Sequence, residues 1–402
     1  MRQSFFSFLF YSLYFIIYGG IHAYVYFKLR SALGAGWKWT GFYALFALIM
    51  IAGARTLWVA DLSGFPVIKQ IFSYSVYSWM AFIFMTFNVF IMLDLIRIFL
   101  WAIDGALSSR FGELMPSPRV RVAAALIIAA GLCIYGWFEA LDIRPVYITI
   151  MSEKLPTGVD RVRVAQISDV HLGWIIREER LASMLEVVRE ASPDMLVITG
   201  DLVDGDMQER EEEVALFRDL NLPEGVFAVT GNHEYHAGID QALAFMEHSG
   251  IRVLRNEAVR AGDIVLAGVD DRAGRFYGHG EIPPDASVLA GAEQDSFVLF
   301  LKHQPIIEPE AVGLFDLQLS GHTHGGQIWP FSVITARFNK TKQGLWAIVP
   351  HGGAGQAHAE SAEKRSMIYI SNGTGTWGPP IRFLAPSEIT VFDIVKERAP
   401  QE

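Results

Sequence analysis

The stretch Leu319-Ser320-Gly321-His322-Thr323-His324-Gly325-Gly326-Gln327 places two histidines, one residue apart, between an apolar run and a pair of glycines. This pattern is typical of a loop at the end of a strand, where both imidazoles can point at one site. Three clusters upstream carry matching residue types: Asp169-Val170-His171, Gly200-Asp201 and Gly231-Asn232-His233-Glu234. Together with a lone His303, they favour a metal-binding site.

Short apolar runs alternate with helical stretches from Arg163 onward, which indicates an α/β domain. A stripe of Leu181, Met184, Leu185 and Val188 predicts an amphipathic helix over 178–190, and 242–247 is also expected to be helical. Strands are expected at 164–167, 195–199, 226–230, 264–267, 297–301, 317–320, 367–370 and 389–392. Five of them run into a candidate ligand: Asp169, Asp201, Asn232, His303 and His322. Sites in α/β sheets gather beyond strand ends, so we expect these side chains to converge.

Imidazole and carboxylate groups are the ligands that Mn²⁺, Fe²⁺ and Zn²⁺ accept. Asp169 and His171 are two residues apart on a predicted turn, so both can reach one ion, and the same holds for His322 and His324. The two oxygens of Asp201 could bridge two ions about 3.5–4 Å apart, the separation found in two-metal hydrolases. Neighbouring glycines permit the tight turns that such ligands need.

In this order, the clusters resemble the signature of the calcineurin-like metallophosphoesterases, over about residues 160–395. The resemblance implies a four-layer αββα sandwich holding two divalent metal ions, of Mn, Fe or Zn. It implies one metal bound by Asp169, His171 and His324, and a second bound by Asn232, His303 and His322. Asp201 would bridge them.

The resemblance also assigns residues to the chemistry of the phosphate. His233 would face the phosphate and either help stabilise charge or protonate the leaving oxygen, and Glu234, where many members have Asp, would orient His233. Two further residues are candidates for substrate binding. Arg382 would contact phosphate or form a surface ion pair, and His236 would approach the substrate or be merely solvated.

Charge is distributed unevenly along the 402 residues. Residues 1–142 carry a net charge of +4 and residues 143–402 a net charge of −14. An acidic domain repels a phosphate backbone, which argues against a nucleic-acid partner. We expect Asp204, Asp206 and the run 209–213 to form a solvated acidic surface. The single cysteine, Cys133, excludes an intramolecular disulfide and a zinc site built from cysteines.

The longest apolar runs lie in the N-terminal part of the chain. Uncharged or nearly uncharged runs predict four transmembrane helices, at about 4–27, 39–60, 71–93 and 122–138. Residues 1–142 are therefore expected to form an all-α anchor, and residues 143–402 the phosphoesterase domain. Two alternatives remain open: the first run as a signal peptide, and the second and fourth runs as buried helices of a soluble domain.

Basic residues are more frequent in the loops after the first and third runs than on the other side. The positive-inside rule then places these loops in the cytoplasm and the catalytic domain outside it. We expect an integral protein of a bacterial inner membrane.

These expectations define a membrane-anchored phosphoesterase that attacks a lipid-linked or envelope phosphoester with metal-activated hydroxide. Three segments, 268–271, 344–346 and 378–383, resemble a bacterial branch that includes UDP-2,3-diacylglucosamine pyrophosphohydrolases, so that activity is the alternative. An inactive membrane scaffold is a weaker alternative, because no expected ligand is lost. Membrane lipid is the expected partner, and no protein partner is expected. The stretch 331–365 is interpreted as a functional loop or lid, or as a plain surface excursion.

Overall fold

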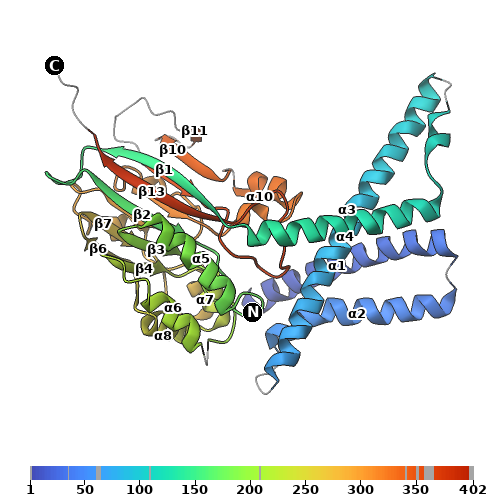
Figure 1. Cartoon of the computed structure of the whole chain (residues 1–402), viewed down its shortest axis with the longest axis horizontal. Coiled ribbons are helices and arrows are strands. Elements are labelled where there is room, and N and C mark those ends of the chain that lie inside the picture. Colours follow the sequence, from blue (N-terminus) through green and yellow to red (C-terminus); the bar gives the residue numbers. More distant parts are fainter. Residues whose placement is uncertain are drawn as a thin grey trace. The chain divides into compact units, whose positions relative to one another are not determined.

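The structure is a computed structural model that describes residues 2–34, 36–59, 65–107, 110–207, 210–339, 342–349, 353–356 and 366–397. The chain divides into two compact units (Figure 1). The first contains Met1–Phe138 together with Gly378–Ile381, and the second contains Glu139–Trp377 and Arg382–Glu402.

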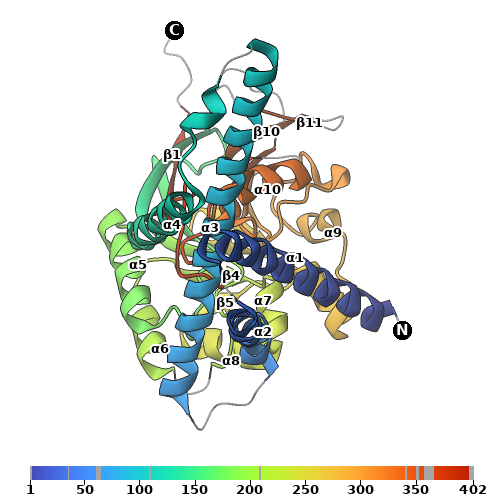
Figure 2. The same cartoon turned by 90° about the vertical axis from the view of Figure 1, so that its right-hand side faces the viewer.

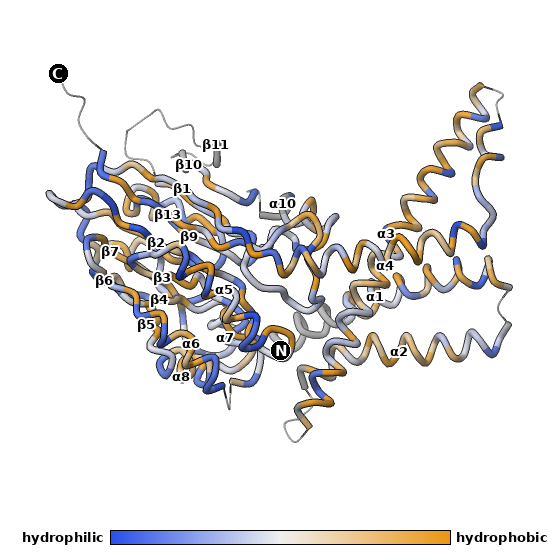
Figure 3. The backbone as a smooth tube through the Cα atoms, viewed as in Figure 1, coloured by the Kyte–Doolittle hydropathy of each residue, from blue (hydrophilic) through white to orange (hydrophobic). Residues whose placement is uncertain are grey.

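The first unit is helical, with a helix at each of the four predicted positions. Its elements are α1 (Arg2–Leu33), α2 (Trp37–Val59), α3 (Pro66–Leu107), the 3₁₀ helix η1 (Phe111–Leu114) and α4 (Pro118–Leu141). Apolar residues dominate these helices (Figure 3). Within the described part of the chain, three stretches are long and apolar enough to cross a membrane: Trp37–Ala54, Val67–Leu107 and Pro118–Leu141. The prediction of α-helical membrane segments is therefore supported for three stretches, and a count of four stays a prediction.

A charged pair connects α1 and α3 just beyond their uncharged runs. Lys28 Nζ lies 2.6 Å from Asp94 Oδ2, and the Tyr24 hydroxyl donates to the same oxygen at 2.6 Å. Lys28 follows the end of the first run and Asp94 follows the end of the third. The pairing therefore brings the C-terminal ends of these two runs together.

The second unit contains two mixed β-sheets, which confirms the α/β prediction. The six-stranded sheet has the order β1-β13-β2-β3-β4-β5, and the seven-stranded sheet has the order β11-β10-β12-β9-β8-β7-β6. The strands are β1 (Arg144–Ser152), β2 (Arg161–Ile167), β3 (Met195–Thr199), β4 (Gly225–Val229), β5 (Ile251–Val253), β6 (Glu257–Ala261), β7 (Ile264–Gly268), β8 (Val298–Leu301), β9 (Leu317–Ser320), β10 (Gly344–Val349), β11 (Gly353–Gln356), β12 (Met367–Ile370) and β13 (Glu388–Lys396). The helices are α5 (Glu178–Ala191), α6 (Glu211–Arg218), α7 (Asn232–Ala237), α8 (Ile239–His248), α9 (Asp285–Leu289) and α10 (Phe331–Asn339), with 3₁₀ helices η2 (Arg272–Tyr277), η3 (Pro309–Ala311) and η4 (His324–Gly326).

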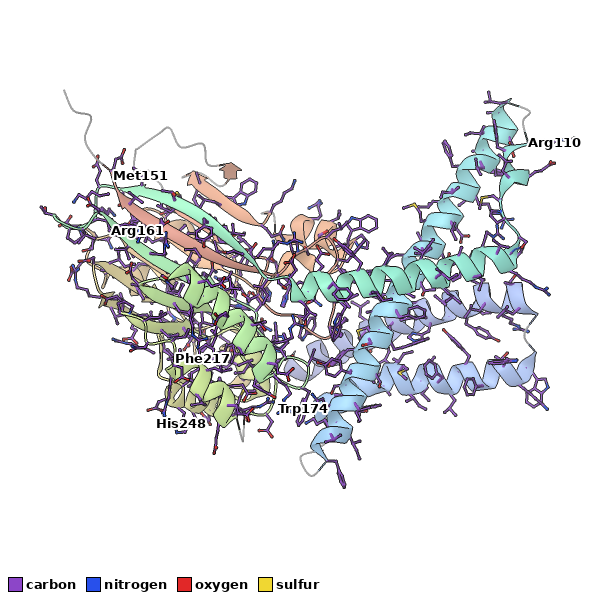
Figure 4. All side chains as sticks on the ribbon, in the orientation of Figure 1. Arg110, Met151, Arg161, Trp174, Phe217 and His248 are labelled. Atoms are coloured by element: carbon purple, nitrogen blue, oxygen red, sulfur yellow. The ribbon has the colours of Figure 1, made fainter. Side chains whose placement is uncertain are left out.

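Three buried clusters hold this unit together. One lies between the two sheets, where side chains such as Val164 from the first sheet pack with Leu299 and Leu319 from the second. Another joins the outer face of the first sheet to α5, α6 and α8, and a third covers the outer face of the second sheet. The α5 helix buries Leu181 and Leu185 of its predicted stripe. It lies beside α6 in both views (Figures 1 and 2), and the buried Phe217 of α6 is labelled in Figure 4.

Several elements were absent from the sequence-based prediction. The strand β1 pairs in parallel with β13 at the edge of its sheet, and five of its nine residues are exposed. The alternating Val146, Ile148 and Ile150 were its signal in the sequence. The stretch 331–365, expected as a loop or surface excursion, instead contains α10, β10 and β11, while residues 357–365 lie outside the described part. The predicted acidic surface is also partly wrong. Glu213 is buried on α6, where Arg210 Nη1 donates to it at 2.8 Å, and Glu209 lies outside the described residues.

Candidate metal centre

Loops at the ends of five strands, drawn from both sheets, converge on one site. Asp169 and His171 follow β2, Asp201 follows β3, and Asn232 begins α7 after β4. His303 follows β8 and the His322–His324 loop follows β9. The structure therefore brings together six of the seven residues that the sequence nominates as ligands, and the seventh, Asn232, directly precedes His233, whose backbone N–H donates to Asp201.

One group of possible ligands contains Asp169, His171 and His324, all buried. The Nε2 atoms of His171 and His324 are 3.0 Å apart, and His324 Nε2 lies 3.3 Å from Asp169 Oδ1. Two imidazole nitrogens and a carboxylate oxygen thus face a common point. Such a donor set suits a borderline divalent cation.

A second group contains Asp201, His303 and His322. Asp201 Oδ2 lies 3.0 Å from His303 Nε2, which in turn is 3.2 Å from His322 Nδ1. The same Oδ2 atom is 3.9 Å from His171 Nε2 of the first group. The other oxygen, Oδ1, accepts the backbone N–H of His233 at 2.8 Å. One oxygen of Asp201, rather than the two expected from sequence, therefore faces both groups.

Charge interactions inside the centre are strong because the side chains are buried. Burial alone would raise the pKa of Asp201, but the imidazoles of His303 and His233 hold it well below its usual range. Conversely, burial would lower the pKa of His303, and the carboxylate of Asp201 raises it well above the usual value. Burial and the adjacent imidazole of His171 lower the pKa of His324. His324 is thus held in the neutral form that binds metals, whereas a metal must displace a proton from His303.

Two observations test whether these residues fit a metal. Asn232 Oδ1 is buried without a hydrogen-bond partner, and leaving such an acceptor unpaired costs about 1–3 kcal/mol unless a cation or water takes it. His303 Nδ1 lies 2.8 Å from the carbonyl of Thr199, so the proton on Nδ1 is donated to the backbone. The Nε2 atom therefore points towards Asp201. When a metal displaces the Nε2 proton, the ring keeps its proton on Nδ1, which is the tautomer expected of a metal ligand. Both residues therefore fit the binding of a metal ion.

The backbone at the site is strained. Five of the predicted ligands have left-handed backbone angles, which residues other than Gly, Asn and Asp rarely adopt. They are Asp169 (φ 54°), His171 (φ 56°), Asp201 (φ 51°), His322 (φ 71°) and His324 (φ 50°). Each such residue costs about 1–3 kcal/mol, and strain of this kind clusters at functional sites.

Two glycines are required by close approach rather than by conformation. A Cβ atom on Gly321 would lie 1.9 Å from Ser168 Oγ and 2.2 Å from Asp169 Oδ2. A Cβ atom on Gly231 would lie 2.2 Å from Asp201 Oδ1. The absence of a side chain at these two positions therefore lets the ligand loops approach one another.

The carboxylate that contacts His233 is Asp204, not Glu234. Asp204 Oδ1 lies 2.6 Å from His233 Nδ1, while Glu234 accepts the backbone N–H groups of Gly231 (2.6 Å) and Asp201 (3.0 Å). The prediction that Glu234 orients His233 is wrong, because its carboxylate is committed to the loop backbone. The prediction of Asp204 as a solvated surface residue is also wrong. Its position three residues after Asp201, in the same loop, was the available signal.

Burial opposes ionisation of His233, yet the carboxylates of Asp201 and Asp204 outweigh it and raise the pKa of His233 to about 9. His233 is therefore an imidazolium at neutral pH in the metal-free protein. Its ring lies edge-on to Trp377 at 5.5 Å and stacks on the exposed His236 at 5.3 Å. His236 is thus beside the candidate acid, and its role in substrate binding stays a prediction.

Arg382 does not offer its guanidinium to a substrate. The side chain is fully buried, and its Nε atom donates to the carbonyl of Gly375 at 2.9 Å. Further bonds of 2.7–3.3 Å reach the carbonyls of His324, Asn372, Gly373, Gly375 and Ala385. The prediction of a phosphate contact or surface ion pair is wrong, because these carbonyls converge on the guanidinium and use its N–H groups.

The sequence model of the calcineurin-like phosphoesterase family matches residues 162–326. An uncharacterized metallophosphoesterase from Aquifex aeolicus (strain VF5) is 37% identical over 272 residues, which cover 67% of this chain and 98% of that protein. A transmembrane protein with metallophosphoesterase domain from Danio rerio is 32% identical, over 66% of this chain and 61% of its own length. Among solved structures, a 5'-nucleotidase precursor from Thermus thermophilus aligns with 58% of this chain and 54% of its own, at 11% identity and a TM-score of 0.33. That last overlap is too partial to bear on function.

Proposed function

Because this chain belongs to the calcineurin-like metallophosphoesterase family and is a metal-dependent phosphoesterase, we propose that it hydrolyses a lipid-linked or envelope phosphoester with two metal ions. The observation that carries this proposal is the position of Asp201 Oδ2, which lies 3.0 Å from His303 Nε2 and 3.9 Å from His171 Nε2. A single carboxylate oxygen facing two sets of imidazoles suits a position between two cations.

In this proposal, Asp169, His171 and His324 would hold one ion, Asn232, His303 and His322 would hold the other, and Asp201 would lie between them. Bound divalent cations supply Lewis acidity to the phosphate and lower the pKa of a bound water.

Side chains of the protein deliver the proton and hold the loops in place. His233 carries its proton at neutral pH, and its Nδ1 faces Asp204, so Nε2 is the atom that delivers a proton to the leaving oxygen. Glu234 holds the loop backbone from which Asp201 and His233 project.

The membrane part of the proposal assigns residues 1–142 to an anchor of four spans and residues 143–402 to the catalytic domain. Three stretches that could cross a membrane support it, as does the name of the Danio rerio relative. The pair Lys28–Asp94 adds support, because the ends of the first and third runs meet on one side only if a second run crosses back between them.

Metal content and hydrolysis of bis(p-nitrophenyl) phosphate test the two-metal proposal. Asp201→Asn keeps the size of the side chain and is expected to lower the metal content below two per chain and the rate at least about 100-fold. Asp240→Asn makes the same change at an exposed position on α8 and serves as the control. Equal activity and metal content in the two variants would reject the mechanism.

The side of the membrane on which the catalytic domain lies tests the substrate class. The distribution of basic residues favours an extracytoplasmic domain in a bacterial inner membrane. C-terminal reporters that work in only one compartment should then be active outside the cytoplasm. Activity inside instead would favour a UDP-2,3-diacylglucosamine-type pyrophosphohydrolase, since that substrate carries a nucleotide.

A further inference from the structure

An apolar surface lies beside the metal centre, and it consists of Trp329, Phe331, Val333, Ile334 and Trp377. These side chains are between 37% and 62% exposed, with Val333 at the upper end. Four of them lie in or next to α10, which begins only seven residues after His324. We call these five residues the apolar rim.

The helix α10 differs from the other helices of the same unit. The α5 and α8 helices bury their apolar faces and turn charged residues outward. In α10, by contrast, none of the side chains that the structure describes is buried, and Phe331, Val333 and Ile334 are exposed. Core packing therefore does not account for its apolar residues, and contiguous exposed patches of this kind mark interaction sites.

Hydrogen bonds connect one member of the rim, Trp377, to the loop that follows His324. The side chain of Gln327 accepts the backbone N–H of Trp377 at 2.9 Å and donates to its carbonyl at 3.2 Å. The Trp377 ring in turn lies 5.5 Å from the ring of His233. Whatever covers Trp377 therefore lies next to the group proposed to protonate the leaving oxygen.

The segment that carries four of the five rim residues has the opposite charge to the domain as a whole. No acidic residue occurs from Leu317 to Ala359, although residues 143–402 carry a net charge of −14. The same stretch contains three basic residues, of which Arg337 and Lys342 are exposed. Tryptophans, aliphatic side chains and cations together are the composition that binds the interface of an anionic bilayer.

We propose that the apolar rim inserts into the interface of an anionic lipid bilayer, and thereby presents the metal centre to phosphoesters at headgroup depth. The membrane-spanning stretches keep the domain near a bilayer, so weak insertion suffices through the high effective concentration. The inference rests on the proposed function for the identity of the reaction, and on the exposed residues for the docking itself.

A fluorescent label tests the insertion in the full-length protein. Cys133→Ala removes the single cysteine, and Val333→Cys then carries an NBD label, in nanodiscs of phosphatidylcholine and phosphatidylglycerol that hold one chain each. The expected result is emission at shorter wavelength than in water and quenching by brominated acyl chains. Ser183→Cys, exposed on α5, is the matched control and should show neither effect.

Two results would overturn the proposal. Val333 and Ser183 labels with the same water-like emission would show that the rim stays in solvent. A shift without bromine quenching would show that protein, not lipid, covers the rim. Metal-dependent hydrolysis of bis(p-nitrophenyl) phosphate by the same labelled protein would leave the proposed function standing in either case.

A kinetic test uses Val333→Glu combined with Ile334→Glu. For an aryl phosphodiester of a bilayer-embedded lipid, kcat/KM of the double variant should be at least about tenfold lower than that of the unaltered protein. For soluble bis(p-nitrophenyl) phosphate, kcat/KM should be unchanged. Equal kinetics on the embedded ester for the variant and the unaltered protein would contradict the proposal.

Discussion

Replacing Asp204 by asparagine tests the pairing that activates His233. The two side chains meet at 2.6 Å, and Asp204 is largely buried. Hydrogen bonds to charged groups contribute about 1.5–3 kcal/mol, so losing the charge on Asp204 should lower the rate about 10- to 150-fold when proton delivery limits it. The buried carboxylate is also one of three that raise the pKa of His233, with Asp201 and Glu234, so the variant should have a lower pKa at this imidazole.

The pH profile gives the sign of the effect. A general acid works only while protonated, so activity should fall as the pH rises through the pKa of His233, about 9 in the metal-free protein. In Asp204→Asn, this basic limb should move to lower pH. A neutral imidazole would then predominate over more of the working range.

The assay compares two substrates that differ in the leaving group. An alkyl phosphodiester needs a proton on its leaving alkoxide, whereas p-nitrophenolate leaves without one, so Asp204→Asn should slow the alkyl ester much more. Asp219→Asn, an exposed position at the end of α6, is the control. Equal losses on both esters with an unmoved basic limb would refute the role of Asp204.

Three further predictions concern Gly321, Arg382 and His303, which lie in or support the loops of the metal centre. Gly321→Ala should reduce metal content and lower the melting temperature by several degrees, because its Cβ would overlap Ser168 and Asp169; unchanged metal content by mass spectrometry would contradict this. Arg382→Lys should destabilise the domain by about 3 kcal/mol, since an ammonium cannot reproduce the planar set of donors, whereas Arg161→Lys on the surface should change the unfolding free energy little. Metal binding should release a proton from His303 and strengthen as pH rises; calorimetry in buffers of different ionisation enthalpy should detect it, and buffer-independent heats would count against it.

Local patterns were sufficient for the strand ends and the ligand candidates. Each candidate ligand follows a short apolar run that forms a buried strand. Because ligand sites lie beyond the carboxyl ends of such strands, these side chains are expected to gather there. The helix α5 was equally clear, because its apolar stripe repeats with the helical period and is buried as predicted.

Long-range contacts explain what the sequence did not reveal. The strand β1 pairs with β13, more than 240 residues away, so its position in the sheet could not be read from its own alternating apolar residues. Asp204 resembled a solvated residue because its charge is offset by an imidazole contributed by another loop. Arg382 resembled a phosphate ligand because the carbonyls that surround it come from three separate segments that meet only in the folded chain.

The position of β13 has a consequence for biosynthesis. It is the last strand of the domain, yet it lies between β1 and β2, which are the first two. A nascent chain therefore exposes its apolar helices to the membrane machinery long before the six-stranded sheet can close. The ribosome must release β13 before β1 has its neighbour, and the Arg382 segment that braces the His324 loop emerges only shortly earlier. With the proposed membrane anchor, insertion of the helices would precede completion of the catalytic fold, and a prematurely terminated chain would be anchored but inactive.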